Sequence, residues 1–177
     1  ERIRKEKYEG AFVFQPTPGL YENLAIFDFT SMHASIIVSY NLSKSTLLEK
    51  NEKNCYESPE LELNGKKTKF YFSKKSGFFP ELLKEIVELR KKYKKELKSN
   101  QLNPILKARS NAFKLLANAY YGYLGFFGAR YYCVEAAAST LAFVRKYNKE
   151  TIENVSKEGY KVIMADTDSV GFLLNKK

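Results

Sequence analysis

Three acidic residues follow apolar, strand-like segments at the points where these segments give way to turns. Asp28 follows one such run, and Asp166 and Asp168 lie between the runs 160–165 and 170–174. The last two runs predict a β-hairpin with carboxylates at its tip. If Asp28 ends a strand beside this hairpin, the carboxylates converge, and such a cluster is costly unless hard cations bind in it. Two Mg²⁺ ions would suit that arrangement; the alternative is a solvated turn, in which Asp is common.

The middle of the chain has the periodicity of helices. Apolar residues recur at helical spacing from Glu81 to Leu97, and a second periodic segment runs from about Ile105 towards Tyr121. Two such segments joined by a short turn predict an antiparallel helical hairpin. Shared faces of the two helices carry Arg90 and Lys94 on the first, and Lys114, Asn118 and Tyr121 on the second. The alternative for these lysines is a solvated charged face.

An acidic cluster and a basic hairpin complement each other in the way that phosphoryl transfer requires. Cations hold the oxygens of a triphosphate, while metal ions activate the nucleophile and stabilise the leaving pyrophosphate. Considered together, the two features explain each other as parts of a phosphoryl-transfer site.

Four segments, in order, resemble motifs of the family B DNA polymerases. Residues 28–37 resemble D-x-x-S-L-Y-P-S-I-I, residues 114–122 resemble K-x-x-x-N-S-x-Y-G, and residues 166–168 match D-T-D. Residues 8–11 resemble the Y-x-G-G/A element, which lies between the exonuclease and polymerase regions of that family. The resemblance covers nearly the whole chain, and the connecting segments look archaeal in type.

This resemblance implies a DNA-directed DNA polymerase core, which transfers a nucleotide from a dNTP to a primer 3′-OH. The catalytic residues would be Asp28, Asp166 and Asp168. The two Mg²⁺ ions would be held by Asp28, Asp168 and the main-chain carbonyl of Phe29, with Asp166 supporting the site. The primer–template DNA and the dNTP would be the partners of this core.

The resemblance also assigns substrate-binding residues. Those for the triphosphate are Arg90, Lys94, Lys114, Asn118 and the main-chain amides around Ser31, Met32 and His33. Tyr121 with Gly122 would form the floor beneath the nascent base pair. Tyr8 and Gly10 would contact the template strand.

Several residues depart from the family pattern. His33 replaces the tyrosine that excludes the ribose 2′-hydroxyl, and Ala34 replaces a proline. An imidazole can hydrogen-bond to that hydroxyl, so we expect weaker exclusion of ribonucleotides; the alternative is a ring that only packs between strand and hairpin. Ala119 and Met164 replace hydroxyl-bearing residues, and we expect them to reduce the rate without abolishing chemistry.

The expected architecture is an α+β polymerase palm, an antiparallel sheet with helices on one face, into which a helical-hairpin fingers subdomain is inserted. Residues 1–22 would be a lead-in, 23–78 the first part of the palm, 79–122 the fingers and 123–177 the second part of the palm. A long helix is expected at about 133–156. Residues 44–75 look like a surface insertion with a hairpin turn at Asn64 and Gly65, between strands at 61–63 and 69–72.

Composition agrees with a nucleic-acid enzyme without identifying one. The formal charge of +10 and the pI of about 9.4 indicate attraction to polyanions. A hydrophobic content of 44% allows a core in 177 residues. Since we find neither a membrane-length apolar stretch nor a signal-peptide pattern, we expect a soluble, cytoplasmic chain. Cys55 and Cys133 lack a zinc-ligand spacing, and reduced thiols are expected.

The family normally has an exonuclease domain before the Y-x-G element and a thumb after the D-T-D hairpin. We therefore expect these segments of the same polymerase as partners, and weak, distributive synthesis or none from this chain alone. The alternative is a non-catalytic nucleic-acid-binding fragment, or a split-polymerase subunit that is inactive without those parts.

Overall fold

The computed structural model describes residues 7–16 and 18–175, which form a mixed α+β fold. Residues 1–6 of the expected lead-in and residues 176–177 lie outside this range. The described helices are α1 (Met32–Ser39), α2 (Phe78–Ser99), α3 (Pro104–Gly125) and α4 (Val134–Lys157). None of these helices combines the length and the apolar composition needed to cross a bilayer.

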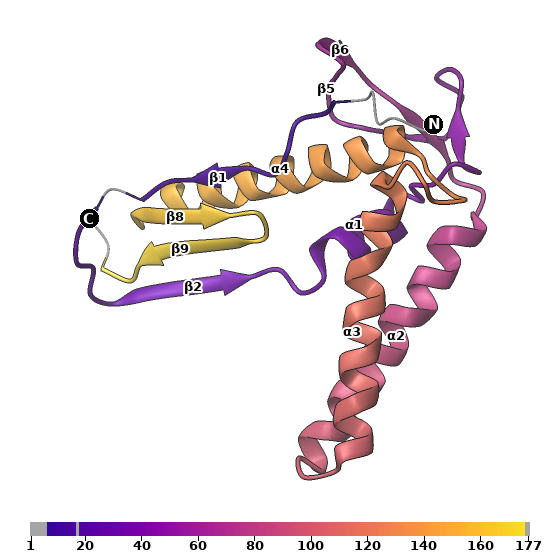
Figure 1. Ribbon diagram of the computed structural model, residues 1–177. Coiled ribbons are helices and arrows are strands. Elements are labelled where there is room, and N and C mark those ends of the chain that lie inside the picture. Colours follow the sequence, from indigo (N-terminus) through magenta and orange to yellow (C-terminus); the bar gives the residue numbers. More distant parts are fainter. Residues whose placement is uncertain (1–6, 17, 176–177) are drawn as a thin grey trace.

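An antiparallel four-stranded sheet lies at one end of the molecule (Figure 1). Its order is β1-β8-β9-β2, formed by β1 (Val13–Phe14), β8 (Val162–Asp166), β9 (Ser169–Leu173) and β2 (Leu24–Asp28). The β8–β9 hairpin is the one that the sequence predicts, and β2 pairs with β9 along its whole length. Asp28 therefore ends an edge strand beside the D-T-D turn.

Helix α4 packs on one face of this sheet, because alternate strand residues point towards it. Ala165, Val170 and Phe172 are buried on that face and pack against Ile152 and Val155 of α4. On the other face Ile26 is 58% exposed, so the described residues leave that side of the sheet largely uncovered. Figure 1 shows α4 running behind the strands and beyond their end.

The main core surrounds the short helix α1, which packs against α2, α3 and α4. Its largest fully buried apolar side chains come from widely separated positions between residues 37 and 144: Ile37, Leu42, Phe72, Leu83, Leu124 and Val144. Complete burial of such side chains contributes about 1.5–3 kcal/mol each. This packing fixes α1 between the sheet and the other helices.

Helices α2 and α3 form the expected antiparallel hairpin, which projects away from the sheet (Figure 1). Helix α2 begins at Phe78, one turn before the predicted start. Pro80 is tolerated in this first turn, because the amides of a helix's first turn have no intrahelical acceptor and the missing amide of a proline therefore costs no hydrogen bond. The Asn103 side chain caps α3 by accepting from the amides of Ile105 and Leu106. The rings of Tyr93 and Phe113 stack between the helices, 5.5 Å apart.

Residues 44–75, which we expected to be a surface insertion, are exposed over much of their length but also contribute to the core. Strands β3 (Leu47–Leu48), β4 (Cys55–Glu57) and β7 (Tyr71–Ser73) form a three-stranded sheet whose Phe72 is fully buried. Strand β5 (Leu61–Leu63) pairs instead with β6 (Lys66–Thr68). The turn at Asn64 and Gly65 is confirmed, with φ of 53° and 76°. Because a two-residue turn pairs the residues directly beside it, the partner of β5 is 66–68 and not 69–72.

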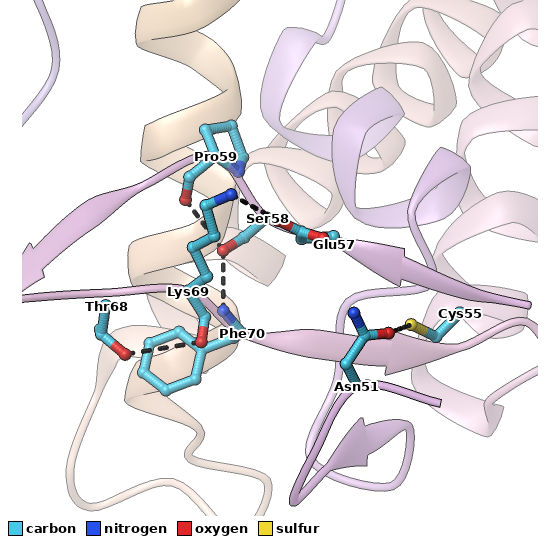
Figure 2. A network of polar contacts seen from close by, with 8 residues as sticks. All are labelled: Asn51, Cys55, Glu57, Ser58, Pro59, Thr68, Lys69 and Phe70. Atoms are coloured by element: carbon cyan, nitrogen blue, oxygen red, sulfur yellow. Dashed lines mark hydrogen bonds and ion pairs between the residues drawn. The ribbon is translucent and has the colours of Figure 1, made fainter. Parts of the chain in front are cut away.

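Polar contacts join the strands of this segment (Figure 2). Ser58 accepts from the amide of Phe70 at 2.9 Å, and Lys69 pairs with Glu57 at 2.5 Å. The Cys55 thiol donates to Asn51. Both cysteines are free thiols, and burial raises the pKa of Cys133 to about 12. No disulfide joins Cys55 and Cys133.

Arg145 of α4 connects this helix to residues 9 and 10. Its Nη1 donates to the carbonyls of Glu9 and Gly10 at 2.8 and 2.7 Å, and its Nη2 lies 3.2 Å from the Glu9 carboxylate. The Arg145 side chain is 8% exposed, whereas that of Glu9 is 60% exposed. The bonds to the carbonyls should therefore contribute more than the ion pair.

We expect Arg145→Met to lower the free energy of unfolding by about 2–3 kcal/mol, because two carbonyls lose a charged donor. Glu9→Gln is the matched control, since it removes only an exposed ion pair worth less than about 1 kcal/mol. Urea unfolding measures both. Equal losses in the two variants would contradict the dominant role of the carbonyl bonds.

Candidate active site

A cavity of about 620 Å³ lies between the end of β2, the start of α1 and the inner face of the α2–α3 hairpin. It lies within the range of about 300–1,000 Å³ that is usual for small-molecule sites. Most of the residues singled out from the sequence line it: Asp28, Phe29, Ser31, Met32, His33, Arg90, Lys94, Lys114, Asn118, Tyr121 and Asp168. Residues from distant parts of the chain thus meet around one space.

The acidic side of the cavity is formed by strand pairing. The Phe29 amide donates to the Asp168 carbonyl at 2.8 Å, which joins the end of β2 to the D-T-D turn. This bond places Asp28, Phe29 and Asp168 side by side on the cavity wall. The sequence contains only three aspartates, and all of them lie at this end of the sheet.

Asp166 lies on the same face of the sheet as Asp28, because both residues are paired with Ser169 from opposite sides. It is not part of the cavity wall, and its carboxylate accepts a hydrogen bond from the Thr167 hydroxyl at 2.9 Å. In the described part of the chain, no three His, Cys, Asp or Glu residues form a group that could hold a metal ion. Two of the three carboxylates therefore line the cavity, and the supporting role of Asp166 stays a prediction.

The residues on this wall still suit a hard cation. Mg²⁺ prefers oxygen ligands and commonly binds through one or two carboxylates while it keeps several waters. Asp28 and Asp168 supply two carboxylates to one open cavity, and the Phe29 backbone lies between them. The donor set thus fits Mg²⁺ with few protein ligands and does not fit a closed, all-protein cage.

The basic side of the cavity comes from the helical hairpin. Arg90 and Lys94 on α2 face Lys114 and Asn118 on α3 across the same space. Their spacing of four residues puts each pair on one helical face, as the sequence predicted. Three cations therefore stand opposite two carboxylates, and this imbalance favours an anionic ligand.

The N-terminus of α1 completes the cavity. Ser31 precedes the helix with φ of 54°, and its hydroxyl accepts a hydrogen bond from Arg90 and does not cap the helix. The first amides of a helix have no intrahelical partner and favour anions. The backbone around Met32 and His33 is therefore suited to bind phosphate oxygens together with Arg90.

His33 lies against Tyr121, with ring centroids 4.8 Å apart and planes tilted by 42°. Burial lowers the pKa of His33 below 6.5, although the nearby Asp168 carboxylate acts in the opposite direction. The imidazole is consequently neutral near pH 7. It offers one donor and one acceptor to the cavity instead of a charge.

Three predicted DNA-contacting residues lie outside this cavity. Tyr8 is half-buried and packs against the core, and the Gly10 carbonyl accepts from Arg145. Gly122 is exposed, with open space where a side chain would be. Their contact with DNA stays a prediction.

Sequence reasoning missed two buried polar residues of α4, Arg145 and Asn148. Asn148 is fully buried and donates to the Thr167 carbonyl at 3.2 Å, within the D-T-D turn. The available signal was their spacing of three residues beside the apolar stretch 141–144. Polar residues on the buried face of a helix need partners, and these partners were not visible in the local sequence.

Comparisons with known proteins show the family to which the chain belongs. The chain matches the model of DNA polymerase family B over residues 1–176 and belongs to that family. It is 40% identical over 170 residues to a DNA polymerase of Thermococcus gorgonarius, covering 93% of this chain and 21% of the relative. It is 38% identical over 174 residues to DNA polymerase 1 of Pyrococcus abyssi, covering 96% of this chain and 22% of the relative.

The fold comparison points to the same family. The structure of the family B DNA polymerase from the hyperthermophilic archaeon Pyrobaculum calidifontis matches 99% of this chain with a TM-score of 0.76 and 38% identity. The match covers 23% of that polymerase. The chain thus spans about a fifth of the length of the relatives that it matches.

The lowered pKa of His33 leads to a pH-dependent stability. Because the folded state binds this proton less tightly than the unfolded state, stability is highest above the unfolded pKa of 6.5 and falls as the pH drops below it. Since His33 is the only histidine of the sequence, its ring protons report the titration without ambiguity in NMR spectra. We expect a midpoint below 6.5, and urea unfolding of His33→Asn should lose this pH dependence. A midpoint above 6.5 would contradict the burial effect.

Proposed function

We propose that this chain carries the nucleotide-binding and catalytic part of a DNA-directed DNA polymerase, which adds a dNTP to a primer 3′-OH. The observation that carries this proposal is one cavity that unites Asp28 and Asp168 with Arg90, Lys94 and Lys114. The membership of the chain in DNA polymerase family B supports the same conclusion. The sheet with α4 would be the palm, within 23–78 and 123–177, and the α2–α3 hairpin would be the fingers, within 79–122.

The basic residues would bind and orient the triphosphate. The planar guanidinium of Arg90 can grip phosphate through two parallel bonds, and its contact with Ser31 already places it at the start of α1. Lys94 and Lys114 would act as point charges from the two helices of the hairpin. The α1 amides near Met32 and His33 would donate to the same phosphate oxygens.

The carboxylates would hold the metal ions. Asp28 and Asp168 would be the protein ligands, next to the Phe29 backbone, and Asp166 would support them from the same face of the sheet. When bound, two Mg²⁺ ions would supply charge stabilisation for the attacking 3′-oxygen, the α-phosphate and the leaving pyrophosphate. The pairing of β2 with β9 keeps the two carboxylates in place for that task.

The remaining contacts concern DNA and the rest of the polymerase. Tyr121 with Gly122 would support the nascent base pair, and Tyr8 and Gly10 would contact the template. The net charge of +10 suits a polyanionic partner. Exonuclease and thumb segments of the same polymerase would be the protein partners, and a cytoplasmic location stays a prediction.

Nucleotide binding tests the basic side of the cavity directly. We expect Lys114→Ala to weaken dNTP binding in Mg²⁺ by about tenfold or more, because one charge-assisted phosphate contact is lost. Lys107→Ala is the matched control, since Lys107 is exposed on the same helix and does not line the cavity. Calorimetric titration measures both. Equal weakening in the two variants would indicate general charge attraction in place of this site.

Single-nucleotide extension of a primer–template in Mg²⁺ tests the catalytic proposal. Extension by the chain, alone or with exonuclease and thumb segments added, should disappear in Asp168→Asn. Asp166→Asn should retain more activity, because Asp166 does not line the cavity. DNA binding without extension under all these conditions would favour the non-catalytic fragment.

The position of His33 yields a prediction about sugar selection. We expect His33→Tyr to lower the ratio of ribonucleotide to deoxynucleotide incorporation, because a larger ring beside Tyr121 would occupy the space near the 2′-hydroxyl. Competition between labelled UTP and dTTP in the extension assay measures this ratio. Unchanged ratios would show that His33 has only a packing role.

A further inference from the structure

The tip of the β8–β9 hairpin adopts an unfavourable backbone conformation. Thr167 has φ of 51°, in the left-handed region that a β-branched residue rarely occupies. Such conformations cost about 1–3 kcal/mol and persist only where surrounding contacts hold them. The turn between the two aspartates therefore needs external support.

Main-chain bonds provide part of that support. The Thr167 amide donates to the Phe12 carbonyl at 3.1 Å, and the Phe29 amide donates to the Asp168 carbonyl at 2.8 Å. Within the turn, the Asp168 amide donates to the Asp166 carbonyl at 2.6 Å. These bonds leave the Thr167 carbonyl to a partner outside the sheet.

That partner is the side-chain amide of Asn148, at 3.2 Å. Asn148 is fully buried on α4, and its Oδ1 has no hydrogen-bond partner among the described residues. A buried amide with an unsatisfied oxygen is a poor contributor to stability, since the oxygen loses its hydration. The Asn148 side chain thus contacts the turn through its Nδ2, while its Oδ1 stays unpaired among the described residues.

Helix α4 supports the neighbouring segment in a similar way. Arg145, three residues before Asn148, holds the carbonyls of Glu9 and Gly10. Phe12, which accepts from Thr167, follows two residues later. One face of α4 therefore holds the D-T-D turn directly through Asn148 and indirectly through residues 9–12.

We propose that Asn148 is a positioning residue, which holds the Thr167 carbonyl and thereby fixes where the Asp168 carboxylate lies in the cavity. This inference rests on the proposed function, because it assigns Asn148 a part in the same reaction. Asn148 lies behind the sheet and does not line the cavity, so it acts through the turn and not on the substrate.

Hydrogen exchange tests this support without any need for activity. We expect Asn148→Leu, which keeps the branched shape but removes the donor, to speed amide exchange at residues 167–169 by about three- to tenfold. The melting temperature should stay the same or rise, because the unsatisfied Oδ1 is removed as well. Asn148→Ala is a second variant in case the leucine does not fit. Ser139→Ala is the matched control, since Ser139 is another buried, unsatisfied polar residue of α4 that is not bonded to the turn.

The Mg²⁺ dependence of primer extension provides the second readout. The Asn148 variants should need at least about threefold more Mg²⁺ for half-maximal rate. Without the hydrogen bond to the Thr167 carbonyl, the turn holds the Asp168 carboxylate less firmly in the position that binds Mg²⁺. The proposal would be overturned if amide exchange at residues 167–169 were no faster in the Asn148 variants than in Ser139→Ala. It would also be overturned if these variants extended primers more slowly but with the same Mg²⁺ dependence as the wild type. Faster exchange in the Asn148 variants, with no extension by the wild-type chain even when exonuclease and thumb segments are added, would overturn the proposed function and retain the structural support.

Discussion

The pairing of β2 with β9 is the interaction on which the site depends. It joins an early and a late segment of the chain, and the bond from the Phe29 amide to the Asp168 carbonyl extends it into the turn. Without this pairing, Asp28 and Asp168 would not be held next to each other at the cavity. Helix α4 secures the same region from behind, because its apolar side chains cover one face of the sheet and its buried polar residues reach residues 9–10 and the turn.

Charge complementarity links this sheet to the helical hairpin. The carboxylates repel one another and the three cations do likewise, so each group is best accommodated when an anionic ligand and hard cations lie between them. The rings of Tyr93 and Phe113 stack between the helices of the hairpin and help to hold its two cationic faces together. The short helix α1 lies where the sheet and the hairpin meet, and the core residues Met32, Ala34 and Ala117 form part of the cavity wall.

The local features of the fold could be predicted from the sequence, and the features that depend on distant contacts could not. The hairpin around Asp166 and Asp168 and the spacing of Arg90 with Lys94 follow from short-range patterns and from the family motifs. The pairing of β5 with 66–68, the burial of Phe72 and the exclusion of Asp166 from the cavity depend on packing between distant segments. The role of α4 was missed for the same reason, since the partners of Arg145 and Asn148 lie far away in the chain.

The central claim is that one cavity receives both the triphosphate and its metal ions. A crystal structure of the chain with Mg²⁺ and a non-hydrolysable dNTP analogue tests it most directly. The account predicts phosphate density against Arg90, Lys94 and Lys114, with metal density at Asp28 and Asp168. Nucleotide bound elsewhere, or bound in this cavity with its phosphates turned away from the hairpin, would contradict it.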